Sequence, residues 1–127
     1  MLPDPATHDR LEAEYRELTA RPGLTPVPGP WMHITVLHAP PVTRLTAQQA
    51  AQMAALVADE CASLAPFAAA ISPAEAWHTG IVCAVRPGPP LRSLWQVTAS
   101  AAQVTGGARE TRLAVYYPHL TVAYTAT

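Results

Sequence analysis

One six-residue pattern occurs twice in the chain, and it restricts both segments to the same kind of structure. Residues 31–36 read Trp-Met-His-Ile-Thr-Val, and residues 117–122 read Tyr-Pro-His-Leu-Thr-Val. In an extended strand neighbouring side chains point to opposite faces, so a histidine and a threonine two positions apart share a face. Each copy therefore predicts a strand that buries its aliphatic residues and presents an imidazole beside a hydroxyl. In the second copy, this alternation predicts that Leu120, Val122 and Tyr124 face the core.

The composition is that of a folded domain. Half of the 127 residues are hydrophobic and 13% are charged, which argues against a disordered chain. The length suits a single domain over residues 1–127. A formal net charge of −1 does not provide the broad basic surface that binds a duplex. We therefore expect one domain that does not bind duplex DNA, and we expect any nucleotide ligand to be short.

Two further features bear on the cellular compartment. Cys61 and Cys83 have no metal-ligand spacing and are too few for a disulfide framework, so we expect two buried free thiols. No apolar segment approaches the roughly 20 residues that span a bilayer, and the first residues lack the basic and apolar regions of a secretion signal. These features predict a cytoplasmic protein without a membrane partner.

Hydrophobic spacing predicts an α+β fold. Amphipathic spacing predicts helices at residues 6–20, 47–64 and 91–104, the second of them capped by Thr46. Apolar runs bounded by proline and glycine predict strands at residues 31–38, 67–71, 80–85, 112–116 and 119–124, after an extended loop at residues 24–30. Residues 72–77 are a turn or a continuing strand. Because the connection to residue 80 is short, it favours a hairpin and hence antiparallel strands under segregated helices.

The paired motifs carry residue types that cleave phosphodiesters. In-line cleavage needs a base for the nucleophile and an acid for the leaving oxygen, and two imidazoles can fill these opposite roles near neutral pH. His33 and His119 supply that pair, although the residue types do not say which is the base. The hydroxyls of Thr35 and Thr121 can donate hydrogen bonds to the non-bridging phosphoryl oxygens.

Other side chains are weaker candidates for substrate binding. Trp31 and Tyr117 precede the two histidines by two positions, where they can either stack on a nucleobase or pack at a strand end. Arg44, Arg109 and Arg112 can hold phosphate or can be ordinary surface residues. No cluster of His, Cys, Asp or Glu has ligand spacing, so we expect no metal and no cofactor.

The two motifs make the chain similar to the two-histidine phosphoesterase superfamily, which includes 2',3'-cyclic phosphodiesterases and the bacterial so-called 2'-5' RNA ligases. Its members carry two His-x-Thr/Ser-x motifs at about this interval, and residues 33–36 and 119–122 match both. The resemblance covers residues 6–124. It implies two pseudo-symmetric lobes of antiparallel sheet, with helices on the outer faces and a central cleft between the motifs, and catalysis without a metal.

The resemblance also implies a difference at the two ends of the domain. Members of the superfamily usually have a strand before the first helix and further strand after the second motif, and the sequence predicts neither. We expect this domain to lack those two strands. Exposed sheet edges would follow, and a second copy of the chain could cover them in a homo-oligomer.

These observations together predict an enzyme. We expect a metal-independent phosphodiesterase acting on a 2',3'-cyclic phosphate or a 2'-5' phosphodiester of a small nucleotide or RNA end. Two alternatives remain open at this point. The same cleft can hold a nucleotide or phosphate without turnover, or the histidine pair can transfer protons on a substrate without phosphate, since a fold does not specify a function.

Overall fold

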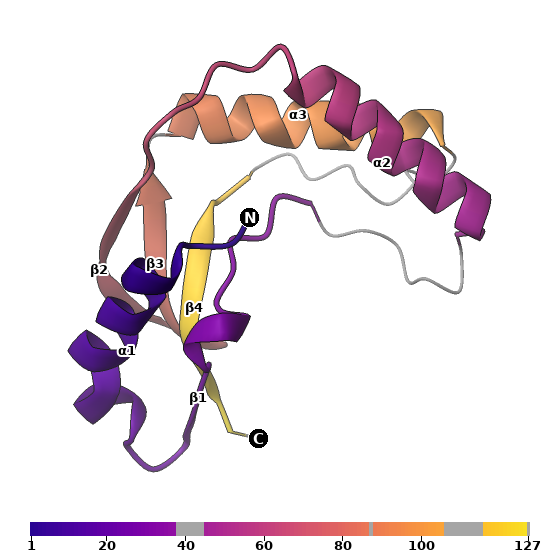
Figure 1. Cartoon of the computed structure of the whole chain (residues 1–127). Helices are drawn as coiled ribbons and strands as arrows, with labels where there is room; N and C mark the ends of the chain where they lie inside the picture. The colour runs from indigo at the N-terminus through magenta and orange to yellow at the C-terminus, as the bar shows by residue number, and fades with distance from the viewer. Residues whose placement is uncertain (38–44, 87, 106–115, 127) are drawn as a thin grey trace. The chain divides into compact units, whose positions relative to one another are not determined.

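The structure is a computed structural model that describes residues 1–37, 45–86, 88–105 and 116–126 of the chain (Figure 1). The chain divides into two compact units. The first contains residues 1–35, 69–86 and 117–127, and the second contains residues 36–68 and 87–116. Both His-x-Thr segments therefore belong to the first unit.

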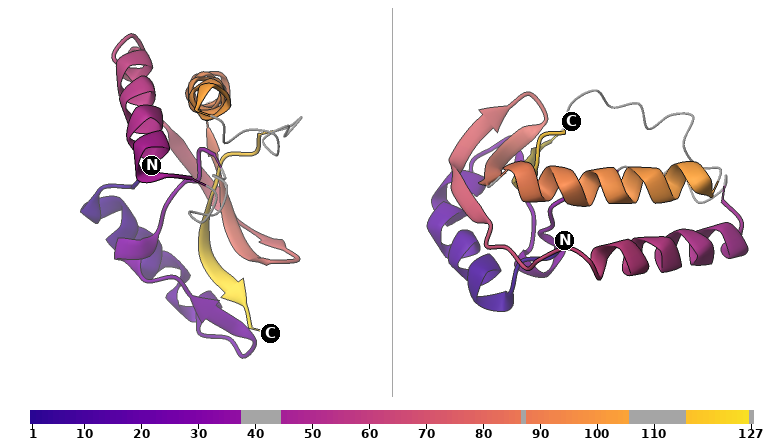
Figure 2. Two further views of the ribbon diagram at one scale, coloured as in Figure 1. Left: turned by 90° about the vertical axis from the view of Figure 1, so that its right-hand side faces the viewer. Right: turned by 90° about the horizontal axis from the view of Figure 1, so that it is seen from above.

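The first unit is built on one four-stranded antiparallel sheet with the strand order β1-β4-β3-β2. Its elements are α1 (Pro5–Thr19), β1 (Leu24–Pro26), the 3-10 helix η1 (Gly29–Trp31), β2 (Ala70–Trp77), β3 (Gly80–Arg86) and β4 (His119–Thr125). The last strand, β4, lies inside the sheet between β1 and β3 (Figures 1 and 2). The sheet thus joins three separate parts of the sequence.

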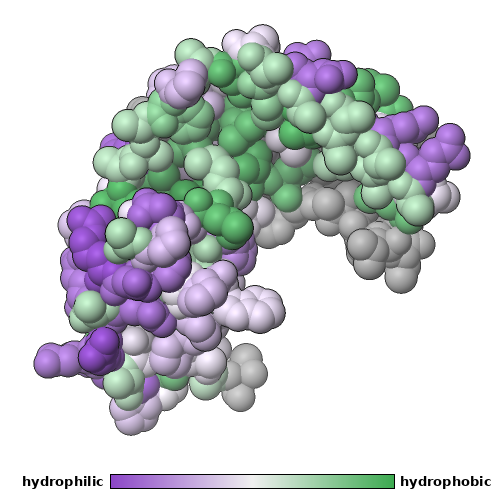
Figure 3. Space-filling view, in the orientation of Figure 1, coloured by the Kyte–Doolittle hydropathy of each residue, from purple (hydrophilic) through white to green (hydrophobic). Residues whose placement is uncertain are grey.

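Helix α1 confirms the helix predicted at residues 6–20. Its N-cap is Asp4, whose carboxylate accepts hydrogen bonds from the Thr7 amide at 3.0 Å and the Thr7 hydroxyl at 2.7 Å. These bonds hold the pKa of the Asp4 carboxyl below its usual value. The helix ends before Gly23, which adopts a φ of 86° that glycine tolerates without strain. The outward face of α1 is hydrophilic (Figure 3), as an amphipathic surface helix requires.

Much of the core of this unit lies between α1 and one face of the sheet. The Tyr15 hydroxyl accepts a hydrogen bond from the Ala74 amide at 3.0 Å, where the pairing of β2 with β3 shifts between Ile71 and Ala74. The bond supplies a partner at an irregular point of the ladder. Burial raises the pKa of the Tyr15 phenol and of the Cys83 thiol. The buried hydrophobic residues of the unit are Leu11, Met32, Ile34, Val82, Cys83, Val85, Leu120, Val122 and Ala123.

A bulge in β4 corrects one prediction about the second motif. The register between β3 and β4 shifts by one residue between Ile81 and Val82, which leaves Val122 as the extra residue in β4. Side-chain alternation is therefore interrupted, and Val122 and Ala123 are both buried. The prediction that Tyr124 faces the core is wrong, because beyond the bulge this side chain points outward and is 48% exposed.

The region around the first motif differs more from the prediction. Residues 24–26, predicted as loop, form β1 and pair with β4. The strand predicted at residues 31–38 is wrong for its described part, because Trp31 ends the 3-10 helix and only Ile34 makes a β-bridge there. The backbone of Ile34 has a second partner, since its amide and carbonyl each bond Met1 at 2.8 Å. Two different neighbours, rather than one continuous ladder, hold this segment extended.

The second unit contains two helices that pack against each other, α2 (Ala47–Cys61) and α3 (Gly88–Val104). Thr46 caps α2 as predicted, in a capping box with Gln49: the Gln49 amide donates to the Thr46 hydroxyl at 3.1 Å, and the Thr46 amide donates to the Gln49 side chain at 2.9 Å. Helix α3 begins three residues before its predicted start, because two prolines are compatible with a first helical turn. Cys61 on α2 is half-buried and Cys83 is fully buried, and both are free thiols.

The remaining predictions concern the fold class, the strand at residues 112–116 and membrane-spanning helices. The α+β class and the antiparallel pairing are confirmed, but the described strands form one sheet that carries both motifs, where the sequence predicted two lobes of sheet. Of the strand predicted at residues 112–116, residues 112–115 lie outside the described part of the chain, and Tyr116 is not in a strand. Within the described ranges, none of the helices has the length and apolar character needed to cross a membrane.

Candidate functional site

The two His-x-Thr segments meet in the first unit. Ile34 forms an antiparallel bridge with Leu120, the residue at the same position of the other motif. Continuing this register by one residue each way places His33 across from Thr121, and Thr35 across from His119. The two histidines are then diagonal neighbours. In an antiparallel pair the Cα atoms of diagonal neighbours are about 7–8 Å apart.

All four polar side chains of the motifs share one face. Ile34 is 5% exposed and Leu120 is 0% exposed, so both point into the core. Leu120 pairs with Cys83, whose thiol lies near the Tyr15 hydroxyl of α1. The residues flanking Ile34 and Leu120 therefore lie on the face of the sheet opposite α1, and His33, His119, Thr35 and Thr121 are half-buried or exposed there.

Both imidazoles are held by the same backbone contact. The Nδ1 atom of His33 lies 2.9 Å from the Trp31 carbonyl oxygen, and Nδ1 of His119 lies 2.8 Å from the Tyr117 carbonyl oxygen. A carbonyl oxygen only accepts hydrogen bonds, so in each ring the proton is on Nδ1. This contact leaves Nε2 of each ring as the nitrogen that can take up or release a proton. Two rings in the same tautomer can serve as base and acid.

Trp77, which the sequence did not single out, packs against the ring of one of the two histidines in a tilted arrangement. The ring centroids of Trp77 and His119 are 4.9 Å apart and the ring planes are tilted by 41°. The indole Nε1–H donates a hydrogen bond to the Glu75 carboxylate at 3.2 Å. Alternation alone places Glu75 and Trp77 on one face of a strand. That this face is the histidine face follows only from the register of β2, β3 and β4, because Glu75 pairs with Val82, which pairs with Thr121.

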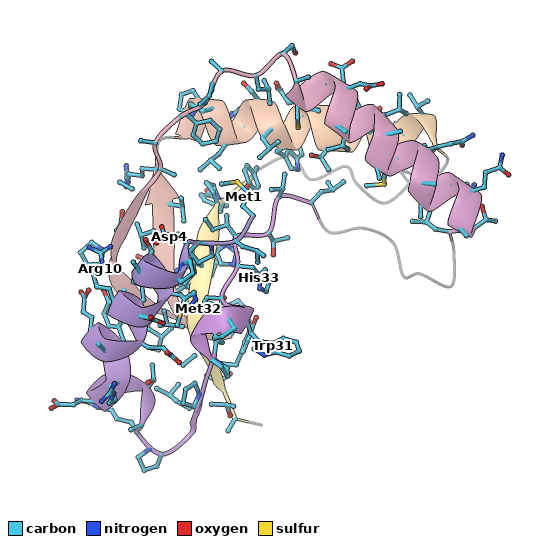
Figure 4. The ribbon with its side chains drawn as sticks, in the orientation of Figure 1. Met1, Asp4, Arg10, Trp31, Met32 and His33 are labelled. Atoms are coloured by element: carbon cyan, nitrogen blue, oxygen red, sulfur yellow. The ribbon has the colours of Figure 1, made fainter. Side chains whose placement is uncertain are left out.

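The two aromatic residues that precede the histidines are both at the surface. Trp31 is 75% exposed and Tyr117 is 70% exposed, so neither is packed in the core. Figure 4 shows Trp31 and His33 projecting on the same side of the chain, whereas Met32 between them points the other way. Met32 lines a pocket of about 270 Å³ under α1. Stacking of a base on either aromatic ring stays a prediction.

The cationic candidates are less well defined. Arg44, Arg109 and Arg112 lie outside the described residues. Within the described part of the chain, Arg86 lies at the end of β3, two positions beyond Ala84, the residue that pairs with His119. Alternation places its exposed side chain on the histidine face. Among the described residues, no group of three His, Cys, Asp or Glu side chains lies close enough together to hold a metal ion.

Comparison with known proteins establishes the family. Residues 7–127 match the family model of the 2'-5' RNA ligase superfamily. The chain therefore belongs to this superfamily, and the resemblance to two-histidine phosphoesterases is confirmed. A comparison with curated protein sequences gave no significant match.

Three solved structures share the fold. The crystal structure of E. coli LigT in apo form is 18% identical over 100% of this chain and 69% of its own, with a TM-score of 0.71. A crystal structure described as a phosphoesterase is 17% identical over 99% of this chain and 73% of its own, with a TM-score of 0.73. The MHV ns2 PDE domain is 15% identical over 94% of this chain and 73% of its own, with a TM-score of 0.67. At these identities the similarity establishes the fold.

Proposed function

We propose that this protein is a metal-independent phosphodiesterase that acts on a 2',3'-cyclic phosphate or a 2'-5' phosphodiester of a small nucleotide or RNA end. The observation that supports it most is the meeting of the two motifs across the Ile34–Leu120 bridge. This arrangement brings two imidazoles with available Nε2 atoms, and two hydroxyls, onto one face. Membership of the 2'-5' RNA ligase superfamily supports the same reaction class.

The proposed reaction needs no group beyond these four side chains. One neutral imidazole takes a proton from the attacking water through Nε2, and the water oxygen bonds to phosphorus. The bond from phosphorus to the leaving oxygen breaks, and the protonated Nε2 of the other imidazole transfers its proton to that oxygen. Negative charge grows on the non-bridging oxygens during this step, where the hydroxyls of Thr35 and Thr121 donate hydrogen bonds.

The proposal also includes substrate-binding side chains and the extent of the domain. Trp31 and Tyr117 are exposed, each two positions before a motif histidine, and suit base stacking, and Arg112 is a further candidate for the substrate phosphate. The domain extends over residues 1–127.

An assay of purified protein tests the proposal. Nucleoside 2',3'-cyclic phosphates and 2'-5' and 3'-5' dinucleotides are incubated with the wild type, His33→Ala and His119→Ala. His78→Ala is the matched control, because it removes an exposed imidazole from the turn between β2 and β3. We expect turnover by the wild type and the control only. Tight binding of these compounds without turnover would instead identify a nucleotide-binding module.

The pH dependence of the same assay tests the two-histidine mechanism. Imidazoles ordinarily titrate near pH 6.5, and the reaction needs one ring neutral and the other protonated. We therefore expect a bell-shaped profile of kcat/KM with its maximum at roughly pH 6–8. A rate that rises continuously through pH 9 would contradict this mechanism.

A further inference from the structure

The two histidines have the same backbone contact but different neighbours. The ring of His119 packs against Trp77, whereas His33 is exposed and has no comparable ring contact among the described residues. We propose that Trp77 is a positioning residue that keeps the shared proton on His119, so that His119 acts as the acid and His33 as the base. This inference rests on the proposed function and assigns its two roles.

The contact fixes the orientation of the His119 ring. The bond from Nδ1 to the Tyr117 carbonyl at 2.8 Å restrains one edge of the imidazole. The indole, with its centroid at 4.9 Å, restrains the tilt of the ring. Aromatic pairs in this separation range attract each other beyond their hydrophobic contact. With both restraints, Nε2 of His119 has a defined direction before substrate binds, as efficient proton transfer requires.

Trp77 and Glu75 also favour the charged form of the ring beside them. The face of an indole attracts a cation within about 6 Å of its centroid, and an imidazolium at 4.9 Å satisfies that limit. Glu75 accepts the indole N–H at 3.2 Å, so its carboxylate places a negative charge at the N–H edge of the same indole. A neutral ring gains neither of these two charge attractions, and this difference between the two forms of His119 is the basis of the proposed role of Trp77.

Other titratable or charged groups also lie around His119. His33 is its diagonal neighbour across the bridge, and Arg86 is its diagonal neighbour toward β3. His78 follows Trp77 in the turn and is exposed. A positive charge on Arg86 or His33 opposes a second positive charge at His119. Trp77 contacts His119 and Glu75 bonds Trp77, so these two residues favour a proton on His119 rather than on His33.

The assigned roles define each transfer. Water loses a proton to Nε2 of His33 and bonds to phosphorus through its oxygen. The leaving oxygen departs with the electron pair of its bond to phosphorus and receives the proton from Nε2 of His119. After turnover His33 is protonated and His119 is neutral, and exchange with solvent restores the starting state.

Titration of the histidine rings by NMR tests the assignment without any turnover. The ring signals of the full chain are assigned from His33→Ala and His119→Ala and followed in the wild type, Trp77→Phe, Trp77→Ala and Glu75→Gln. In Trp77→Ala we expect the titration midpoint of His119 to fall by about 0.4–0.7 pH unit, which corresponds to a contact of about 0.5–1 kcal/mol. The midpoint of His33 should not fall.

The two conservative variants separate this role from a structural one. Trp77→Phe keeps a ring on His119 and should recover most of the lost shift, and Glu75→Gln should lower the midpoint by less than Trp77→Ala does. Circular dichroism of each variant verifies that it is folded, and Glu75→Gln, which should also lower the His119 midpoint, carries the test if Trp77→Ala does not fold. An unchanged or raised His119 midpoint, or an equal fall for His33, would overturn the proposal.

Kinetics then test the roles themselves. In Trp77→Ala the alkaline limb of the kcat/KM profile should move to lower pH, because that limb reports loss of the proton from the acid. We expect kcat to fall roughly ten- to hundredfold through misorientation of the ring, with a smaller change in KM. Movement of the acidic limb instead would reverse the roles. If the wild type turns over no phosphodiester, the proposed function fails, while the titration still decides whether Trp77 holds a proton on His119.

Discussion

The two copies of the motif have nearly the same residues but lie in different backbones. His119 begins β4, a strand that is paired with β3 on one side and with β1 further along the other. His33 follows a 3-10 helix and lies beside an isolated bridge. Even so, both rings bond a carbonyl two residues earlier, at 2.9 and 2.8 Å. The repeated feature is thus a local contact rather than a strand.

This comparison shows what the motif itself needs. The aliphatic residue after each histidine is buried, and that burial turns the histidine and threonine to the other face. A bridge to Leu120 and two hydrogen bonds to Met1 hold Ile34 in its buried, extended position. Leu120 is held in the same way by its place within the sheet. Extended backbone at three residues is sufficient, and its neighbours can supply the hydrogen bonds in more than one way.

The largest expected effect tests whether the two copies contribute equally to chemistry. Replacement of His33 or of His119 by alanine removes one proton-transfer partner, so we expect each variant to lose roughly 10²–10⁴-fold in kcat/KM. The double variant should be little worse than either single one, because the two rings act as a unit. Steady-state rates on the preferred dinucleotide or cyclic phosphate measure this. Near-normal activity in one variant would show that only one copy is used.

The free energy of unfolding should also distinguish the two copies of the motif, with a smaller effect than the loss of a histidine has on activity. Leu120→Ala removes a fully buried side chain from the middle of the sheet, and we expect a loss of about 2–5 kcal/mol in the free energy of unfolding. Ile34→Ala should cost less, because Ile34 lies at an isolated bridge where the chain can relax into the space. Urea denaturation measures both, with the exposed Val104→Ala as a control that should change stability little. A larger loss at Ile34 would contradict this ranking.

The threonines should give a smaller effect than the histidines. Thr35→Val and Thr121→Val keep the shape of the side chain but remove one hydrogen bond to the phosphoryl oxygens, so we expect losses of about one to two powers of ten in kcat. Equal losses would indicate that the two copies hold the phosphate symmetrically. If both valine variants are more damaging than both alanine variants of the histidines, the acid–base mechanism is wrong.

The smallest expected effect is that of a chelator. The four motif side chains supply an acid, a base and hydrogen-bond donors, so excess EDTA should leave the rate unchanged, within about twofold. The assay compares EDTA-treated protein with protein supplied with Mg²⁺, Mn²⁺ or Zn²⁺. Loss of turnover in EDTA and its recovery with one of these ions would show that a metal takes part.

Elements with strong local signals were predicted from the sequence. The helix at residues 6–20, the capping residue Thr46 and the strands at residues 80–85 and 119–124 were recognised from caps, prolines and hydrophobic spacing, and the structure confirms them. Strand β1 was missed because it has three residues and includes a proline, so it has no pattern of its own. Its conformation depends on pairing with β4, a segment about a hundred residues later in the sequence.

The candidate site also has features that the sequence predicts and features that depend on the tertiary structure. The sequence alone determined that two imidazoles and two hydroxyls accompany buried aliphatic residues, because alternation along an extended chain is a local property. Only the tertiary structure decided that Ile34 meets Leu120, that the bulge at Val122 turns Tyr124 outward, and that Trp77 packs against His119. Each of these depends on strand order and register. Register is set by packing between segments that are distant in the sequence, and a shift of one residue reverses the face of every side chain.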